Sequence, residues 1–264
     1  KLPESWGAPI LKLPETGSEG FKIVRPDKNT VLIAGNDEPG ALYGVGWLLR
    51  KMEIKNGHLF IPDSINISST PVYPIRGHQM GYRPKTNAYD AWSVAQFDRY
   101  IRDLIIFGAN SIEIMPPRTD DDFSSIHMKL PAIKMIAEQS RICKEYGLNV
   151  WMWYPNMGSD YSSPDSIKKE LDERENVFGV LPKLDALFVP AGDPGELDPD
   201  LLFDWLGKVA VVLHKFHPDA KIWVSPQVFK PGKEWYDKFY KHVNRQYEWF
   251  GGIVYGPWIR TPLP

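Results

Sequence analysis

Hydrophobic and polar positions divide the chain into two regions of different period. Up to about residue 71, short strand-like runs at 21–24, 30–34 and 58–61 surround one helical pattern at 41–52, which predicts a small α+β module. From residue 72, strand-like runs alternate with helical patterns about every thirty residues. Six strands are expected at 74–83, 111–115, 149–154, 184–189, 221–225 and 252–255, and five helices at 95–107, 131–146, 165–177, 199–216 and 234–249.

The strict alternation in the second region predicts a parallel sheet, because strands separated by helices join through right-handed crossovers. A doubly wound sheet and a TIM-type β/α barrel both fit. The barrel is favoured because no Gly-rich phosphate loop follows the first strand and because polar groups stand at several strand ends. We therefore expect an α/β protein with a domain at 1–71 and a barrel at 72–264.

The number of strands leaves this barrel incomplete. A closed TIM barrel has eight strands, and the sequence supplies about six. We expect the chain to be a fragment, so that a missing C-terminal segment, or another copy in a homo-oligomer, pairs with the open edge of the last strand.

Charge and composition limit the classes of binding partner and the location that we expect for the protein. Lys and Arg total 31 against 33 Asp and Glu, a net charge of −2, so nucleic acid or an anionic membrane is not expected as a partner. No apolar run approaches the ~20 residues of a membrane span. Cys143 is the only cysteine, which excludes an internal disulfide, and its helical surroundings predict a buried thiol. The absence of a disulfide is compatible with the cytoplasm and also with many periplasmic enzymes. We slightly favour a periplasmic or secreted protein.

No cofactor or metal is expected. The histidines lack metal-ligand spacing, and the aspartates at 120–122 read as a solvated loop, although hard oxygens could also bind a divalent cation.

The first region carries a motif of some specificity. Residues 33–37 (IAGND), 40–45 (GALYGV), Leu48-Leu49, and then Ile61-Pro62 and Ile65 follow one another in a fixed order. This order resembles the small domain that precedes the catalytic barrel in family 20 β-hexosaminidases, with related domains in α-glucuronidases and family 84 enzymes. The resemblance implies a carbohydrate enzyme without naming its reaction.

The start of the barrel extends the resemblance. Arg76-Gly77 is similar to the Arg-Gly opening of the family 20 catalytic domain, whose arginine grips sugar hydroxyls, and Arg83 stands near the position of a second arginine. The family aspartate between them has no counterpart here. A guanidinium suits vicinal hydroxyls, and it serves as well in a structural ion pair, so both roles stay open for Arg76.

The loop after the fourth strand carries the main candidate carboxylates. It resembles the family's Gly-Gly-Asp-Glu loop, in which the aspartate orients the acetamido group and the glutamate is the general acid. Asp193 matches the aspartate, but Pro194 replaces the acid and has no proton to donate. Glu196 and Glu113 are the nearest substitutes, and Glu113 alternates with two isoleucines, which predicts a buried carboxyl group near the barrel mouth.

Amide and aromatic groups at the other strand ends are the candidate substrate-binding residues, since aromatic rings stack on the apolar faces of sugars. Core packing explains Trp223 equally well, whereas Trp258, beside glycine and proline in a loop, favours a sugar platform. The candidates are Tyr154, Asn156, Trp223, Gln227, Tyr255 and Trp258.

The leading hypothesis is a glycoside hydrolase that uses a pair of carboxyl groups, Asp193 with Glu196 or Glu113, at the carboxyl ends of the barrel strands. The alternative is a non-catalytic carbohydrate-binding barrel that has lost its acid. An α/β protein of unrelated function is also open, if the small-domain resemblance is chance.

Overall fold

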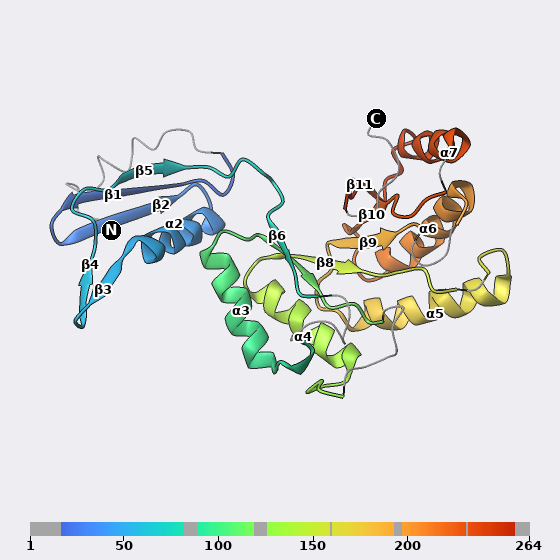
Figure 1. Ribbon diagram of the computed structural model, residues 1–264, viewed down its shortest axis with the longest axis horizontal. Coiled ribbons are helices and arrows are strands. Elements are labelled where there is room, and N and C mark those ends of the chain that lie inside the picture. Colours follow the sequence, from blue (N-terminus) through green and yellow to red (C-terminus); the bar gives the residue numbers. More distant parts are fainter. Residues whose placement is uncertain are drawn as a thin grey trace. The chain divides into compact units, whose positions relative to one another are not determined.

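The computed structural model describes residues 17–81, 89–118, 126–158, 160–192, 197–230 and 232–256. The chain forms two compact units: 1–78 with 99–110, and 79–98 with 111–264. Each unit is described by itself (Figure 1).

A three-stranded antiparallel sheet is the core of the first unit. Strand β1 (Phe21–Asp27) lies in the middle, between β2 (Thr30–Gly35) and β5 (Asn66–Ser69). Strands β3 (Glu53–Lys55) and β4 (His58–Phe60) form a separate hairpin. The sequence pattern predicted neither β3 nor β5, since β3 is exposed throughout and β5 offers only Ile67 as an apolar residue.

Helix α2 (Glu38–Lys51) packs on this sheet through glycines. Asp37 caps its N-terminus by accepting a hydrogen bond from the Gly40 amide at 2.8 Å. A Cβ atom at Gly44 would lie 2.5 Å from Ile33, so only glycine permits this approach. The stripe of larger apolar residues in the helix is on the half-exposed side instead, with Leu42 and Val45 each 42% exposed.

The second region forms a six-stranded sheet in the order β11-β10-β9-β8-β7-β6. The strands from β7 to β11 pair in parallel, each next to its successor in the chain. The bounds are β6 (Gly77–Gln79), β7 (Ser111–Ile114), β8 (Asn149–Trp153), β9 (Ala186–Pro190), β10 (Lys221–Ser225) and β11 (Phe250–Ile253).

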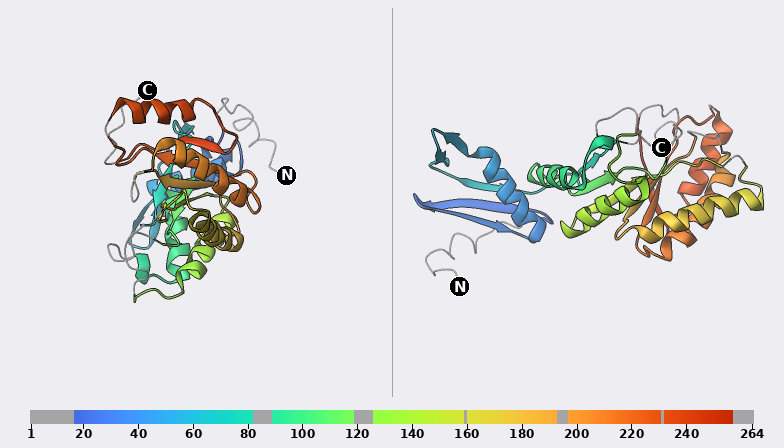
Figure 2. Two further views of the ribbon diagram at one scale, coloured as in Figure 1. Left: turned by 90° about the vertical axis from the view of Figure 1, so that its right-hand side faces the viewer. Right: turned by 90° about the horizontal axis from the view of Figure 1, so that it is seen from below.

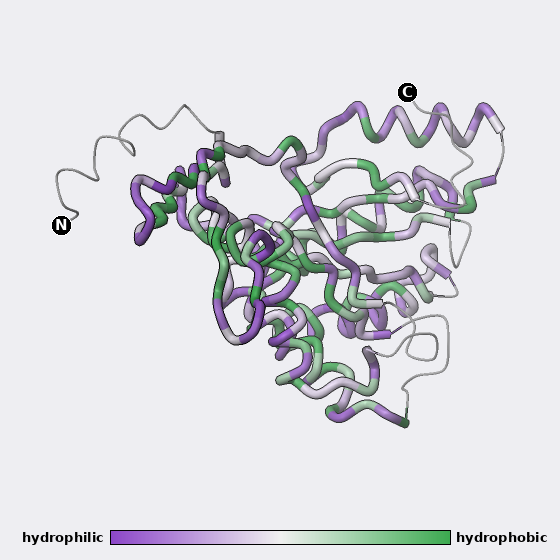
Figure 3. The backbone as a smooth tube through the Cα atoms, turned by 60° about the vertical axis from the view of Figure 1, so that its left-hand side comes forward, coloured by the Kyte–Doolittle hydropathy of each residue, from purple (hydrophilic) through white to green (hydrophobic). Residues whose placement is uncertain are grey.

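Helices fill the connections between these strands (Figures 1 and 2). Helix α4 packs against β7 and β8, and α6 packs against β10. The helices from α4 to α7 contact one another in chain order. The bounds are η1 (Tyr89–Ala91), α3 (Val94–Ile106), α4 (Ala132–Glu145), α5 (Pro164–Val180), α6 (Pro199–His214) and α7 (Lys233–Val243). Their hydrophilic and hydrophobic residues alternate along the chain (Figure 3), as amphipathic helices require.

This architecture confirms the predicted fold class, an α/β protein with a small α+β part followed by the strands and helices of a TIM-type barrel. All six barrel strands and all five helices were predicted within a few residues of their observed ends, except that α7 ends at Val243 rather than near residue 249. Cys143 is fully buried, and burial raises the pKa of its thiol to about 12.

Candidate functional site

The two faces of the parallel sheet differ in chemistry. Every second side chain is fully buried beneath the helices: Ile112, Ile114, Val150, Met152, Leu187, Val189, Ile222 and Val224. The alternate positions face the opposite side, which is the inner side of a β/α barrel. These positions include Glu113, Trp151, Phe188 and Trp223, all partly exposed. Among the residues that the structure describes, the inner face thus presents the Glu113 carboxyl group together with aromatic rings.

The aromatic rings of the inner face lie close together. Trp151 and Trp223 have ring centroids 5.1 Å apart and planes inclined at 45°, across the intervening strand β9. The register partner of Trp151 on β9 is the small residue Ala186. Strand β11 is the neighbour of β10 on the side away from β9. Its backbone lies against the Trp223 indole: a Cβ atom at Gly251 would be 2.3 Å from that side chain. The pair forms an apolar surface of the kind that stacks on sugar rings.

Glu113 is a titratable group on this face. It lies on β7, where Trp151 of β8 is its register partner. Gln79 of β6 donates a hydrogen bond from Nε2 to Glu113 Oε1 at 2.6 Å. Burial raises the pKa of Glu113 from 4.5 to about 7, and the bond from Gln79 opposes that rise in part. A carboxyl group with this pKa can both hold and release a proton near neutral pH.

Asn156 follows the carboxyl end of β8 and is 2% exposed. Its Oδ1 accepts a hydrogen bond from Trp205 Nε1 of α6 at 2.8 Å. Its Nδ2 has no hydrogen-bond partner among the described residues. The predicted amide is therefore in place at the strand end, with one donor unsatisfied.

Tyr154 turns away from the inner face. It is fully buried against α5, where its hydroxyl donates to Glu173 Oε1 at 2.7 Å and its ring lies edge-on to Phe178. Burial raises the pKa of its phenol. These contacts assign Tyr154 a packing position behind the strand ends.

The loops after β9 and β10 approach each other closely. A Cβ atom at Gly192 would lie 2.3 Å from the carbonyl oxygen of Gln227, so glycine is required where these loops meet. Beyond β11, Tyr255 is 41% exposed and its hydroxyl lies 3.2 Å from that of Tyr240 on α7. Gln227 and Tyr255 thus both stand at the carboxyl side of the sheet.

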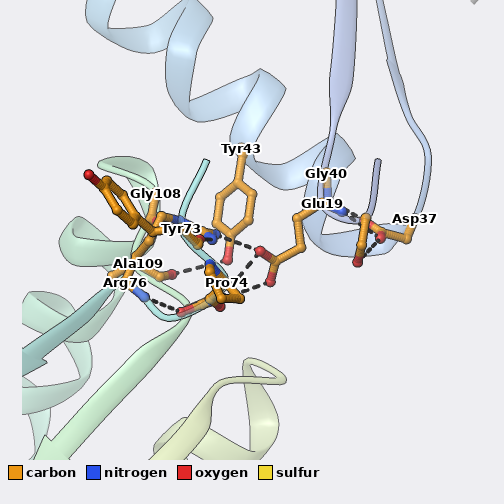
Figure 4. Close-up of polar contacts among 11 residues, drawn as sticks. Glu19, Asp37, Gly40, Tyr43, Tyr73, Pro74, Arg76, Gly108 and Ala109 are labelled. Carbon is orange, nitrogen blue, oxygen red and sulfur yellow. Dashed lines mark hydrogen bonds and ion pairs between the residues drawn. The ribbon is translucent and has the colours of Figure 1, made fainter. Parts of the chain in front are cut away.

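Arg76 lies just before β6, at the amino end of that strand (Figure 4). Its guanidinium donates to Glu19 Oε2 at 2.7 Å, to the Gly108 carbonyl at 2.9 Å and to the Tyr73 carbonyl at 2.8 Å. Asn110 accepts from the Arg76 backbone amide at 2.8 Å. Of the two roles left open for Arg76, these contacts favour the structural ion pair, because each nitrogen of the guanidinium already donates to an acceptor.

The remaining candidates lie outside the described residues. They are Arg83, Asp193, Glu196 and Trp258, together with Pro194 and the aspartates at 120–122. Their roles stay predictions. Within the described part of the chain, no three His, Cys, Asp or Glu side chains gather as a metal site requires. Among the same residues, no helix combines the length and apolar character needed to cross a bilayer.

Sequence reasoning missed two partners that define this site. Gln79 was read only as part of the first barrel strand, and Trp205 only as part of a helix. The alternation on β6 could have placed Gln79 on the same face as Glu113, since β6 and β7 are neighbours in the sheet. Nothing local to Trp205 indicates that its indole reaches the end of β8.

A separate cleft of about 530 Å³ lies beside Arg118, after β7. Arg118 pairs there with Glu170 at 2.6 Å and with Glu173 at 2.9 Å. The cleft is lined by Pro117, Arg118, Leu130, Ile133, Glu173 and Val177, among others, and contains none of the predicted site residues.

Solved structures share this architecture. No protein-family model and no curated protein sequence matches the chain. The protein CpGH84B aligns with a TM-score of 0.62 at 15% identity, over 91% of this chain and 43% of its own. A glycoside hydrolase family 20 β-N-acetylglucosaminidase aligns with a TM-score of 0.62 at 11% identity, over 91% of this chain and 64% of its own. A family 20 exo-β-N-acetylglucosaminidase from Vibrio harveyi, in complex with N-acetylglucosamine, aligns with a TM-score of 0.56 at 11% identity. The alignment covers 80% of this chain and 44% of that structure.

These likenesses concern the fold, and the chain spans between two fifths and two thirds of the length of these structures. The predicted resemblance is confirmed at that level: the chain has the fold of glycoside hydrolases of the family 20 β-hexosaminidase type.

Proposed function

We propose that the protein is a glycoside hydrolase that binds its sugar on the inner face and carboxyl side of the parallel sheet. The observation that carries the proposal is Glu113, a partly buried carboxyl group with a pKa of about 7 next to a paired Trp151–Trp223 surface. An acid in this range is protonated often enough at neutral pH to donate, and it is surrounded by the aromatic surface that sugars favour.

In this proposal Glu113 is the general acid. It takes over the role of the glutamate of the family 20 loop, whose position is occupied here by Pro194. It transfers its proton to the glycosidic oxygen as the bond between that oxygen and the anomeric carbon breaks. Asp193 is the second carboxylate and stabilises the positive charge that develops on the sugar. Water then adds its hydroxyl group to the anomeric carbon, and the proton that it releases returns to the Glu113 carboxylate. Asn156 and Gln227 contribute hydrogen bonds to sugar hydroxyls.

The test is turnover of aryl glycosides of N-acetylglucosamine, glucuronic acid and galactose. We expect the wild type to hydrolyse at least one of them and Glu113→Gln and Asp193→Asn each to lose about 100-fold or more, as removal of a general acid does. Glu145→Gln, on the exposed end of α4, is the matched control and should retain full activity. Equal turnover in wild type and both variants would reject the proposed roles.

The second candidate function is a carbohydrate-binding barrel without turnover. Pro194 in the position of the acid favours it, because the loop after β9 then lacks the donor expected there. Sugar binding by the wild type without hydrolysis of any aryl glycoside would decide for this candidate.

A further inference from the structure

A buried amide at the end of β8 carries an unused hydrogen-bond donor. Asn156 is 2% exposed, and its Nδ2 has no hydrogen-bond partner in the described part of the chain. Leaving a buried donor unpaired costs stability, so native proteins rarely keep one without a reason. A ligand that brings an acceptor atom is one such reason.

The orientation of this amide is fixed by a neighbour. Trp205 Nε1 can only donate, and it donates to Asn156 Oδ1 at 2.8 Å. A flip of the amide would bring its NH2 group against the indole N–H, donor against donor. Nδ2 is therefore fixed as the unpaired atom of the amide, and it can offer only hydrogen atoms to a ligand.

Trp205 is itself held in place. The Arg174 guanidinium lies 5.0 Å from its ring centroid and donates to the carbonyl of Pro155, the residue before Asn156, at 3.0 Å. Arg174 is 1% exposed and its charge is paired with Glu170 on the same helix. One buried arginine thus ties both the tryptophan and the backbone of the amide to α5.

The position of the amide in the fold favours a substrate contact. Asn156 follows β8, β9 is the next strand of the sheet, and Trp205 belongs to the helix that follows β9. The carboxyl ends of parallel strands meet at one edge, which is where β/α folds bind their ligands. The unsatisfied donor is at that edge.

We propose that Asn156 binds the sugar by donating from Nδ2 to one of its oxygen atoms, and that Trp205 is the positioning residue that fixes this donor. The inference rests on the proposed function, because it takes the ligand to be a sugar. The inference adds three details to the proposed function. Nδ2 is the atom that makes the contact, a hydroxyl or carbonyl oxygen of the sugar is the acceptor, and Trp205 is the residue that keeps Nδ2 available as the donor.

The test compares three variants with the wild type by titration calorimetry with free N-acetylglucosamine, glucuronic acid and galactose. Asn156→Leu removes the donor, Trp205→Phe removes the group that orients it, and the double variant removes both polar groups together. We expect about a ten-fold loss of affinity in Asn156→Leu, which corresponds to one hydrogen bond. Trp205→Phe should lose several-fold, and the double variant no more than Asn156→Leu, because orientation is irrelevant once the donor is absent.

Ser140→Ala is the matched structural control. Ser140 is fully buried, and its hydroxyl bonds the backbone of Lys183, before the amino end of β9. It should lower the melting temperature without changing sugar affinity, which separates loss of stability from loss of a ligand contact. Wild-type affinity in Asn156→Leu and in the double variant would overturn the inference while leaving the proposed function intact. Absence of binding to any of the three sugars by the wild type would overturn both.

Discussion

At the scale of single residues, Glu113 is the group to which the proposed function assigns the chemistry of the inner face. Its carboxyl group shares the face with the indoles of Trp151 and Trp223 and accepts a hydrogen bond from Gln79. Burial favours the neutral form, and the bond from Gln79 compensates only part of that effect. The result is an acid that changes charge near neutral pH.

The raised pKa predicts a pH dependence of stability. The folded protein holds the Glu113 proton up to about pH 7, whereas the unfolded chain releases it near 4.5, so the free energy of unfolding should fall as pH rises through this window. Between pH 5 and 8 we expect a loss of about 2–3 kcal/mol from this group. Urea unfolding at several pH values should show that loss in the wild type but not in Glu113→Gln. An identical pH dependence in both proteins would contradict it.

Arg76 yields a second prediction at this scale. Its ion pair with Glu19 is about one fifth exposed on each side and is supported by two backbone carbonyls. Arg76→Met leaves the Glu19 carboxylate without its cation, so the free energy of unfolding should fall by about 1–3 kcal/mol. Sugar affinity should not change. Arg50→Met, an exposed arginine on α2, should leave stability within about 0.5 kcal/mol of wild type.

A large loss of sugar affinity in Arg76→Met, with unchanged stability, would restore the substrate-binding role that the sequence resemblance implied.

At the scale of elements, periodicity predicted the barrel strands well, because each is an apolar run bounded by helices. It failed for β5, whose four residues include one hydrophobic position; that strand exists because β1 offers it a partner. Periodicity also gave the wrong buried face for α2, because it placed the stripe of leucines and valine against the sheet. The helix instead packs through glycines, since only they allow its close approach to the sheet.

The contact between β10 and β11 gives a test at this scale. Gly251→Ala places a Cβ atom where the Trp223 indole now lies, 2.3 Å away. The indole must move, so we expect a loss of about 1–3 kcal/mol and a change in tryptophan fluorescence. Gly256→Ala, where no atom lies within 4 Å, is the control and should be neutral. Trp223→Leu combined with Gly251→Ala should recover part of the loss; if Gly251→Ala behaves like Gly256→Ala, the indole does not pack on β11.

At the scale of the whole molecule, the sequence resemblance and the structural likenesses agree on the fold. The order of motifs in the first region pointed to an accessory domain, and the alternation in the second pointed to a barrel; the structural likenesses include both. The site was less predictable. Glu113 was chosen as a candidate from the alternation within its strand and Asn156 from its place at a strand end, and both stay predictions. Their partners Gln79 and Trp205 come from other elements, and no local pattern indicates such contacts.

The central claim is that a carboxyl group on the inner face of the parallel sheet acts as the acid in glycoside hydrolysis. Its most direct test is the pH profile of kcat/KM for the best aryl glycoside substrate. We predict a rate that falls above about pH 7 as Glu113 loses its proton, and a Glu113→Gln variant in which both the rate and this falling limb are lost. The same rate and the same profile in wild type and variant would contradict the account.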